Sequence, residues 1–472
     1  MGFYLLLTLV TAIITVLAFV LWRKTGHVGF PLGIGLLYFW SLYGAWSIVT
    51  DQLGGDSGKR YDYLLTKMFP VELDENYLWS LFLYASFIIL VELAILGFLR
   101  QDQLQEESPL VVATSRIYIS HTFIMILSTT TMVTSFLIMQ DQLLTAAQLN
   151  MSAYYATRGG LGEYNEWFTL HQILNRVALF ALVMGCAVYM TGNASRFLVG
   201  GKGFAIGLAY LGSMLCTFGF LAMLGNKNEL FSAFILGGLF YLANAKPVKW
   251  SFVVPVGILA FFAIAAIDLL RGFSILALLD SASWWEALAW APEIRSSNEA
   301  FAAHFSLYGV LHFNAAYTYG ASFVALATSI IPRVLWPERP EGTYVQYAEN
   351  LGIYEGAAGQ GYTVHHATGW YLNFGIGGLI IGALLLGFIW ALCYNAHCRA
   401  RPGDRRWTNL LAIVAPAGLV SFMPPLVRAG PEAYKGMIIE AFLIPTLIIL
   451  LASVRWTEVL GLQEHWRETD AK

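Results

Sequence analysis

Charged residues and cysteines are scarce in this sequence. Charged side chains account for 12% of its 472 residues, about half the share found in soluble globular proteins. Hydrophobic side chains account for 57%, and a soluble fold of this size could not bury that much apolar surface. The composition excludes a soluble enzyme, a disordered chain and a nucleic-acid-binding protein. It predicts an all-α polytopic membrane protein.

The four cysteines argue against two further kinds of architecture. They lie in apolar runs or at the ends of such runs, and no two have the spacing of metal ligands. We therefore expect neither a disulfide framework nor a cysteine metal site. The sequence also has no glycine-rich phosphate loop and no Ser-His-Asp arrangement. We expect no metal and no cofactor.

Long apolar runs are abundant. A membrane-spanning helix needs about 20 apolar residues, and eleven runs approach that length. We divide the chain into a bundle of eight spans (1–270), a large loop (271–374) and a part with three spans and a tail (375–472). The predicted spans are Gly2–Trp22, Pro31–Thr50, Tyr77–Phe98, Ser120–Met139, Gln172–Met190, Phe204–Leu224, Leu230–Ala245, Phe252–Leu270, Gly375–Ala396, Trp407–Met423 and Gly436–Val454.

The distribution of basic residues orients these spans. With the N-terminus outside, the cytoplasmic loops and the tail contain 15 of the 27 basic residues but only 8 of the 30 acidic ones. Because cytoplasmic loops are enriched in Lys and Arg, we expect this orientation, which places the large loop on the outer face. Arg23 and Lys24 follow the first run instead of preceding it, which favours an uncleaved first span.

The large loop has 104 residues and is too long to be a simple connection. Ser296–Glu299 has the spacing of a capping box and predicts a helix that carries Phe305 and Tyr308 on one face. The apolar segment Ala321–Ile331 is too short to span the membrane. We expect a re-entrant or half-buried helix there, followed by an extended path through three prolines.

Five arginines gather on the predicted outer face. A guanidinium presents a planar fork that binds phosphate through two hydrogen bonds, so the set predicts an anionic ligand such as a lipid-linked diphosphate. The alternative is that these side chains extend to the membrane surface or pair with nearby acids such as Asp268. Four lie in the large loop and one in the last outer loop: Arg271, Arg295, Arg333, Arg339 and Arg428.

Carboxylates and histidines are the next candidates. Glu299 is a candidate general base, although its capping-box position favours a structural role. His365 and His366 are candidates for binding sugar hydroxyls or moving a proton, with an ordinary loop role as the alternative. Glu92 and Glu440 lie in or near spans, and for both we expect a structural hydrogen bond to a neighbouring helix.

Three segments in the C-terminal half carry more specific motifs. They read YGAS at Tyr319–Ser322, IPRVLWPERP at Ile331–Pro340 and GWYLNFG at Gly369–Gly375. Together they resemble the oligosaccharide repeat-unit polymerase family, the Wzy-type O-antigen and related polysaccharide polymerases. Arg428 matches an arginine in a late outer loop of that family, and the topology is similar over the whole chain. Where relatives often carry a glutamate, this chain has Gly369-Trp370, so no catalytic carboxylate carries over there.

The resemblance implies a glycosyltransferase of the bacterial inner membrane whose active site faces the periplasm. Such a polymerase transfers a growing glycan from undecaprenyl diphosphate to a lipid-linked repeat unit. Its candidate protein partners are a chain-length regulator and a flippase. On this basis we predict that the diphosphate is bound by Arg271, Arg333 and Arg428, with Arg295 and Arg339 as further candidates. The candidates for the general base are Glu299, His365 and His366. The residues predicted to position sugars are Tyr319, Tyr371 and Asn373.

Two alternative functions stay open. An O-antigen ligase, or another lipid-dependent glycosyltransferase, shares the topology and the large outer loop but transfers glycan to a different acceptor. A secondary transporter should carry ionisable residues near mid-membrane, and Glu92 is the only charge well inside a predicted span. Arg176 lies near the outer end of its span and could join the set of outer arginines.

Overall fold

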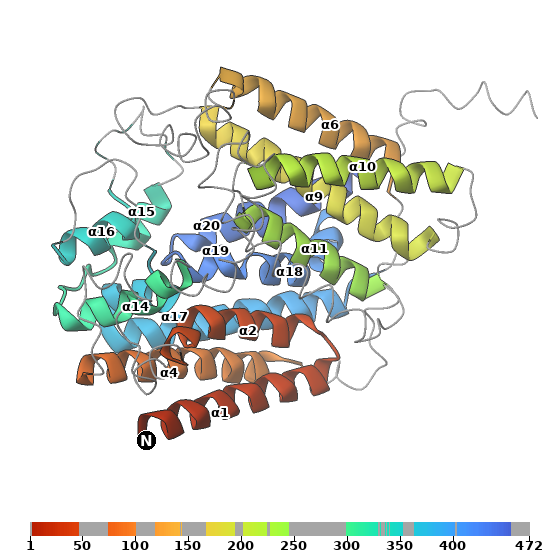
Figure 1. Cartoon of the computed structure of the whole chain (residues 1–472). Helices are drawn as coiled ribbons and strands as arrows, with labels where there is room; N and C mark the ends of the chain where they lie inside the picture. The colour runs from red at the N-terminus through yellow and green to blue at the C-terminus, as the bar shows by residue number, and fades with distance from the viewer. Residues whose placement is uncertain are drawn as a thin grey trace, which may run out of the picture.

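The computed structural model describes residues 2–46, 74–100, 119–141, 143, 167–193, 202–223, 227–244, 299–328, 331, 336, 338, 340–352, 363–401 and 404–454. Within these ranges the regular structure is helical and contains no strand, as the composition predicts (Figure 1). The helices are α1 (Gly2–Thr25), α2 (Gly29–Ser41), α4 (Glu75–Phe98), α6 (His121–Ile138), α9 (Trp167–Asn193), α10 (Lys202–Met223), α11 (Lys227–Asn244), α14 (Glu299–His312), α15 (Ala321–Thr328), α16 (Thr343–Asn350), α17 (His366–Cys398), α18 (Trp407–Ser421), α19 (Met423–Val427), α20 (Ala433–Gly436), the π-helix η4 (Met437–Leu443) and α21 (Ile444–Ala452).

Seven stretches of helix among the described residues are long and apolar enough to cross a membrane. They are α1, α4, α6, α9, α10, α17 and the continuous stretch from α20 to α21. Apolar helical stretches of 10–17 residues lie in three more predicted spans: α2, residues Glu229–Leu242 of α11, and α18. The predicted span Phe252–Leu270 lies outside the described residues. The structure therefore has the helices of a multi-pass membrane protein, and the total of eleven spans stays a prediction.

The helices pack in two groups (Figure 1). α4 packs along α17 with α1 and α2 beside them, whereas α6, α10 and α11 pack around α9. α18 contacts α17, α11 and α2, and it also packs against η4 and α21, so these elements join the two groups. The helices α14, α15 and α16 lie together at one end of the bundle.

Short side chains allow the helices to approach closely. A methyl group added at Gly387 of α17 would lie 2.6 Å from the carbonyl oxygen of Val91 in α4. An added methyl group at Gly33 of α2 would collide with the ring of Trp390. In a membrane, helix association depends on such van der Waals packing because lipid tails are as apolar as the side chains.

Side-chain caps begin two of the long helices. Asp74 accepts a hydrogen bond from the Tyr77 amide (2.7 Å) at the start of α4, and Ser120 accepts one from the Phe123 amide (3.3 Å) before α6. Such residues satisfy amides that have no partner within the helix. These caps define the first turns of two predicted spans.

Contacts between helix ends define one face of the bundle, which we call the basic end. Here Tyr394 donates a hydrogen bond to the carbonyl of Thr25 (3.0 Å), and Asn395 donates to the carbonyl of Phe98 (2.9 Å). These bonds bring the C-terminal ends of α1, α4 and α17 together. The basic side chains at or next to the helix ends of this face are Arg23, Lys24, Arg100, Arg399, Arg401, Arg405 and Arg406.

The opposite face, which we call the loop end, carries α14, α15 and α16. α14 forms where a helix is predicted, and Phe305 and Tyr308 on its predicted face are wholly buried. Residues 296–298 of the capping box lie outside the described residues. α15 begins at the predicted residue, Ala321, and spans 8 residues. α16 follows the last of the three prolines, and most of the predicted extended path lies outside the described residues.

Candidate functional site

At the loop end, Ser41 lies between two histidines from distant parts of the sequence. The Ser41 carbonyl accepts a hydrogen bond from Nδ1 of His304 (2.6 Å), and Oγ of Ser41 lies 2.8 Å from Nε2 of His365. Nε2 of His304 lies 2.9 Å from the hydroxyl of Tyr77. Ser41 ends α2, Tyr77 lies in the first turn of α4, His304 lies on α14 and His365 precedes α17. Four elements are therefore joined by one chain of polar contacts.

The hydrogen bonds determine where each imidazole carries its proton. Nδ1 of His365 accepts the Ala367 amide (3.1 Å), so Nε2 is the protonated nitrogen and donates to Ser41. In His304 the carbonyl partner requires a proton on Nδ1, and Nε2 then accepts from Tyr77. Both rings are neutral in this arrangement, and all four ring nitrogens are engaged.

Burial disfavours the charged form of both rings. Desolvation lowers the pKa of His304 to about 4, although its bond to Ser41 opposes the shift. Desolvation, together with the nearby His366 and His304, holds the pKa of His365 well below 6.5. Neither side chain is more than 1% exposed. In this geometry the two histidines hold the loop helix α14 against α2 and α4.

A second set of hydroxyl contacts lies beside the first. The Tyr84 hydroxyl donates to the carbonyl of Ala303 (3.0 Å) and lies 3.0 Å from Oγ1 of Thr368. Oγ of Ser306 lies 2.8 Å from the same threonine oxygen and accepts the amide of His365 (3.0 Å). These contacts join α4, α14 and the first turn of α17.

His366 connects α17 with the last outer loop. Its Nδ1 donates toward the carbonyls of Ala429 and Gly430, each at 3.2 Å. Nε2 accepts the indole N–H of Trp370 (3.1 Å) and lies 3.2 Å from the hydroxyl of Tyr434. The ring is wholly buried. His366 therefore fixes the backbone that follows Arg428.

Arg428 itself lies over an aromatic ring. Its guanidinium carbon is 5.4 Å from the centroid of the Trp40 ring, close enough for a cation–π interaction. Trp40 is 8% exposed and directly precedes Ser41 in α2. The residue that contacts His365 and the residue that contacts Arg428 are therefore neighbours on the last turn of one helix.

The large loop also reaches this region through α16. Glu432 accepts hydrogen bonds from the amide (2.6 Å) and the hydroxyl (3.3 Å) of Thr343. A methyl group added at Gly430 would lie 2.8 Å from the Thr343 side chain, so the two segments are in close contact. The chain just after the IPRVLWPERP segment is thus held against the loop that carries Arg428.

The remaining described candidates form a second group at a break in α17. Phe374 and Gly375 have non-helical backbone angles, and φ of Gly375 is +62°, which favours glycine. Asn373 donates to the hydroxyl of Ser322 (2.6 Å) and to the carbonyl of Gly369 (2.6 Å). Asn373 is wholly buried, so it joins the first half of α17 to α15.

Two of the candidate tyrosines lie near this break. The Tyr317 ring centroid is 6.1 Å from that of Tyr371 and 6.2 Å from that of Tyr319. Tyr319 is 80% exposed, whereas Tyr371 is 8% exposed. Of the residues predicted to position sugars, Tyr319 is therefore the one with a ring fully open to a ligand.

The structure thus brings His365, His366 and Arg428 into one cluster and places Tyr319, Tyr371 and Asn373 in a second group. Glu299 is the first residue of α14, and its side chain is not among those that the structure describes. The predicted arginines outside the described residues are Arg271, Arg295, Arg333 and Arg339.

Several residues of the cluster carry no functional signal in the sequence. They are Trp40, Ser41, Tyr77, Tyr84, His304, Ser306, Thr368 and Tyr434. Five of them lie at the predicted outer end of an apolar run or in an outer loop, whereas Trp40, Ser41 and Tyr84 lie inside predicted spans. From its sequence context alone, His304 is indistinguishable from an ordinary loop histidine.

The charged residues near the spans have different surroundings. Arg176 contacts Glu440 at 2.5 Å and Glu229 at 3.1 Å, joining α9, η4 and α11. Glu440 therefore has a partner on a neighbouring helix, as predicted. Arg176 belongs to this ion-pair group with Glu229 and Glu440. Glu92 is wholly buried, and neither of its carboxylate oxygens has a hydrogen-bond partner among the described residues. Within that part of the chain, the hydrogen bond expected for Glu92 is not found.

Among the described residues, no group of three or more His, Cys, Asp or Glu side chains could hold a metal ion. Comparison of the chain with protein-family models, curated proteins and solved structures finds no match.

Proposed function

We propose that this chain is a polysaccharide polymerase of the bacterial inner membrane. It transfers a growing glycan from undecaprenyl diphosphate to a lipid-linked repeat unit on the periplasmic face. The observation that carries the proposal is the cluster of Trp40, Arg428, His365 and His366, which joins segments from both ends of the chain at the loop end. The motifs that resemble those of repeat-unit polymerases lie between Tyr319 and Gly375, the part of the sequence that contains His365 and His366.

The charge distribution supports the proposed orientation. The basic end gathers seven Arg and Lys residues at or beside the ends of described helices. Because cytoplasmic surfaces are enriched in such residues, we place this end in the cytoplasm. The loop end then faces the periplasm, where a lipid-linked glycan carries its diphosphate at the membrane surface.

The chemistry of the proposed transfer requires an anion site. An acceptor hydroxyl oxygen forms a bond to the anomeric carbon of the donor glycan, and the bond from that carbon to the diphosphate oxygen breaks. The hydroxyl proton passes to a base, and the leaving diphosphate gains negative charge. Preorganised cations stabilise such a charge most strongly where water is partly excluded. Arg428, half-buried on the Trp40 ring, fits this role.

The buried histidines suit a positioning role in this reaction. His366 holds the two carbonyls that follow Arg428, and His365 holds the serine that follows Trp40. Together they determine where the guanidinium lies relative to α14 and α17. The general base stays a prediction among Glu299, His365 and His366. Glu299 lies at the start of α14, whereas the two histidines lie at the start of α17.

Glycan profiling of a deletion strain tests the proposal. We expect loss of the long-chain ladder with one repeat unit retained on the lipid core. Complete loss of attached glycan would indicate a ligase instead, and an unchanged ladder would reject both activities. The same experiment therefore separates the two lipid-dependent transferases.

Complementation of this strain tests the site. Arg428→Ala and Arg333→Ala should give no long-chain ladder at wild-type protein levels. Arg405→Ala, at the basic end, is the matched control and should restore the ladder. A normal ladder from Arg428→Ala would contradict the assignment of this arginine to the diphosphate.

A further inference from the structure

The proposed transfer needs a base with a lone pair that is free to accept the proton of the acceptor hydroxyl. His365 offers none, because its Nδ1 accepts the Ala367 amide and its Nε2–H donates to Ser41. His366 offers none either, since its Nδ1 donates to backbone carbonyls and its Nε2 accepts the indole N–H of Trp370. Both histidines are wholly buried. A base that meets the acceptor must be more exposed.

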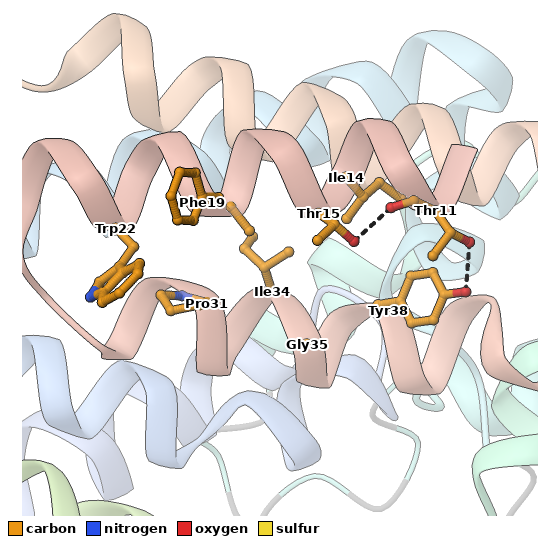
Figure 2. Close-up of a pocket in the computed structure, with 10 residues that line it drawn as sticks. Thr11, Ile14, Thr15, Phe19, Trp22, Pro31, Ile34, Gly35 and Tyr38 are labelled. Carbon is orange, nitrogen blue, oxygen red and sulfur yellow. Dashed lines mark hydrogen bonds between the residues drawn. The ribbon is translucent and has the colours of Figure 1, made fainter. Parts of the chain in front are cut away.

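The groove between α1 and α2 carries no such group. Figure 2 shows that apolar side chains such as Trp22 of α1 and Ile34 of α2 line it. Among the described residues of this lining, none is a histidine, an aspartate or a glutamate. The Tyr38 hydroxyl at its end lies 2.8 Å from Oγ1 of Thr11, so the two groups are paired with each other. The groove therefore supplies no base for the transfer.

His312, on the last turn of α14, differs from the buried histidines of the loop end. Its side chain is 29% exposed, and its Nδ1 lies 3.8 Å from Oδ2 of Asp74. A carboxylate at Nδ1 favours the tautomer with the proton on that nitrogen, which leaves the lone pair on Nε2. Among the described residues, Nε2 has no hydrogen-bond partner. A separation of 3.8 Å exceeds a hydrogen bond, and such contacts often shorten when an enzyme binds its substrate.

Asp74 is held in place by two other groups. Its Oδ1 accepts the Tyr77 amide (2.7 Å) at the start of α4, and its Oδ2 accepts the hydroxyl of Tyr308 (3.4 Å). The Tyr308 ring also lies beside His312, with the ring centroids 5.3 Å apart. Phe313 meets the imidazole edge-on at 5.1 Å. A carboxylate from α4 and an imidazole from α14 are therefore oriented by a shared tyrosine.

The end of α14 does not need the imidazole of His312 as a cap. A histidine in the last turn of a helix often binds the carbonyls that have no partner within the helix. Here the Ala315 amide donates to the carbonyl of Val310 (3.0 Å). Asn314 has a φ of 49°, the left-handed conformation typical of such helix ends. The backbone thus ends the helix by itself, and the imidazole lies near the carboxylate instead.

The position of His312 suits a base for a reaction at Arg428. His304, two turns earlier on α14, contacts Ser41, and the ring of the adjacent Trp40 lies under Arg428. From His304, α14 continues for about 12 Å to His312, at the end of the bundle where α4 begins. The acceptor hydroxyl and the leaving diphosphate are bonded to the transferred sugar in turn, so a separation of this size leaves room for the sugar between cation and base.

We infer that His312 is the general base of the proposed transfer and that Asp74 is its positioning residue. The inference rests on the proposed function, which supplies the acceptor hydroxyl. Nε2 takes the proton of that hydroxyl as its oxygen bonds to the anomeric carbon and the bond from that carbon to the diphosphate breaks. The carboxylate of Asp74 stabilises the imidazolium that forms. The imidazolium returns its proton to water after the transfer.

Turnover of the full-length protein in lipid nanodiscs tests the base. The substrate is the lipid-linked repeat unit extracted from the deletion strain, and the product is its polymer. His312→Ala should lower kcat about 100-fold or more. Added imidazole should restore part of this rate in His312→Ala but not in His312→Phe, whose ring fills the space. A wild-type kcat in His312→Ala, or a rate that imidazole does not change, would overturn the inference.

Asp74→Asn tests the positioning residue. Asparagine also caps helices, so the unfolding midpoint should stay near that of the wild type, whereas kcat should fall about tenfold or more. In the His312→Ala background the same substitution should have no further effect on kcat, because Asp74 acts through the imidazole. A full further decrease in that background would contradict the positioning role. His121→Ala, at the start of α6, is the control and should retain the wild-type kcat.

The same assay separates this inference from the proposed function. If the wild type does not extend the lipid-linked repeat unit, the proposed function is wrong and the assignment of His312 fails with it. If the wild type and His312→Ala extend it at equal rates, the proposed function stands and the assignment of His312 is wrong. A loss of kcat in Glu299→Gln would then assign the base to the first residue of α14.

Discussion

Nε2 of His365 donates a hydrogen bond to Oγ of Ser41 across 324 residues of sequence, at 2.8 Å, in the interior of the loop end. The serine ends a helix near the N-terminus, and the histidine begins the helix that follows the large loop. This contact fixes the large loop to the first helices of the bundle. The cluster around Arg428 depends on the same two helices.

Removal of the Ser41 hydroxyl should destabilise the protein. In Ser41→Ala the buried Nε2–H of His365 loses its acceptor, and an unsatisfied buried donor costs about 1–3 kcal/mol. We expect a lower midpoint of thermal unfolding in detergent. Ser213→Ala is the control, since among the described residues that hydroxyl contacts the sulfur of Met125 at the longer distance of 3.7 Å. Equal midpoints for Ser41→Ala and the wild type would show that the contact contributes nothing.

Acidification should destabilise the loop end through His304. Its pKa is about 4 in the folded protein, against 6.5 for an unperturbed histidine. Between these pH values the unfolded chain binds a proton that the folded protein does not. The contribution of His304 to the free energy of unfolding is therefore fully present above pH 6.5 and decreases as the pH falls toward 4. The loss amounts to about 3 kcal/mol over this interval.

The measurement is the unfolding midpoint as a function of pH in wild type and His304→Gln. The variant should show a smaller decrease between pH 6.5 and 4, because one of the buried imidazoles no longer titrates. His312→Gln, on the last turn of the same helix and partly exposed, serves as the control. An identical pH dependence in His304→Gln and wild type would exclude this histidine as the cause.

The elements of the fold are predictable where a local rule decides them. A segment that crosses a bilayer must be apolar and must satisfy its own backbone hydrogen bonds, so apolar runs indicate helices directly. A helix is predicted where α14 lies, and its buried face follows from the helical spacing of Phe305 and Tyr308. Boundaries are harder to predict: α17 begins at His366, and the predicted start of the span at Gly375 coincides with a break inside this helix.

The site is predictable only in part, because its contacts are non-local. His365, His366 and Arg428 are recognisable as unusual charged or titratable residues in outer loops. The partners that hold them, such as Trp40 and Ser41, lie more than 300 residues away and have no distinguishing local pattern. Packing of α2 against α14 and α19 determines these contacts, and sequence periodicity does not encode which helices meet.

Arg176 should contribute strongly to stability. It lies between Glu440 and Glu229, and its side chain is 20% exposed. Arg176→Ala leaves two neighbouring carboxylates without their cation, which should cost about 3–5 kcal/mol. Thermal unfolding in detergent measures the loss. The double substitution Glu229→Gln with Glu440→Gln in the Arg176→Ala background should recover part of it, and no recovery would contradict the ion-pair explanation.

Replacement of Glu92 should have the opposite effect. Its buried carboxylate has no hydrogen-bond partner among the described residues, so Glu92→Leu removes a desolvation cost and breaks no hydrogen bond within that part of the chain. We expect a higher unfolding midpoint, by an amount equivalent to about 1–3 kcal/mol. A lower midpoint would show that Glu92 has a stabilising partner. A higher midpoint combined with loss of glycan transfer would assign this carboxylate to function.

Under the proposed function, Trp40 should affect donor binding through Arg428. The guanidinium lies 5.4 Å from the centre of the Trp40 ring, and a cation–π contact contributes about 0.5–2 kcal/mol. In Trp40→Leu the guanidinium loses the surface that orients it, so KM for the diphosphate-linked donor should rise about 2- to 30-fold. Trp40→Phe retains an aromatic face and should lie between Trp40→Leu and the wild type.

The comparison of these two variants separates orientation of Arg428 from general packing. Trp40 is buried, so both substitutions also remove volume from the core, and both should lower the unfolding midpoint. In the Arg428→Lys background the ammonium group retains the cation–π attraction but has no planar face to stack on the ring, so the rise in KM caused by Trp40→Leu should become smaller. If Trp40→Leu raises KM equally with arginine or lysine at position 428, the planar face of the guanidinium contributes nothing to the effect.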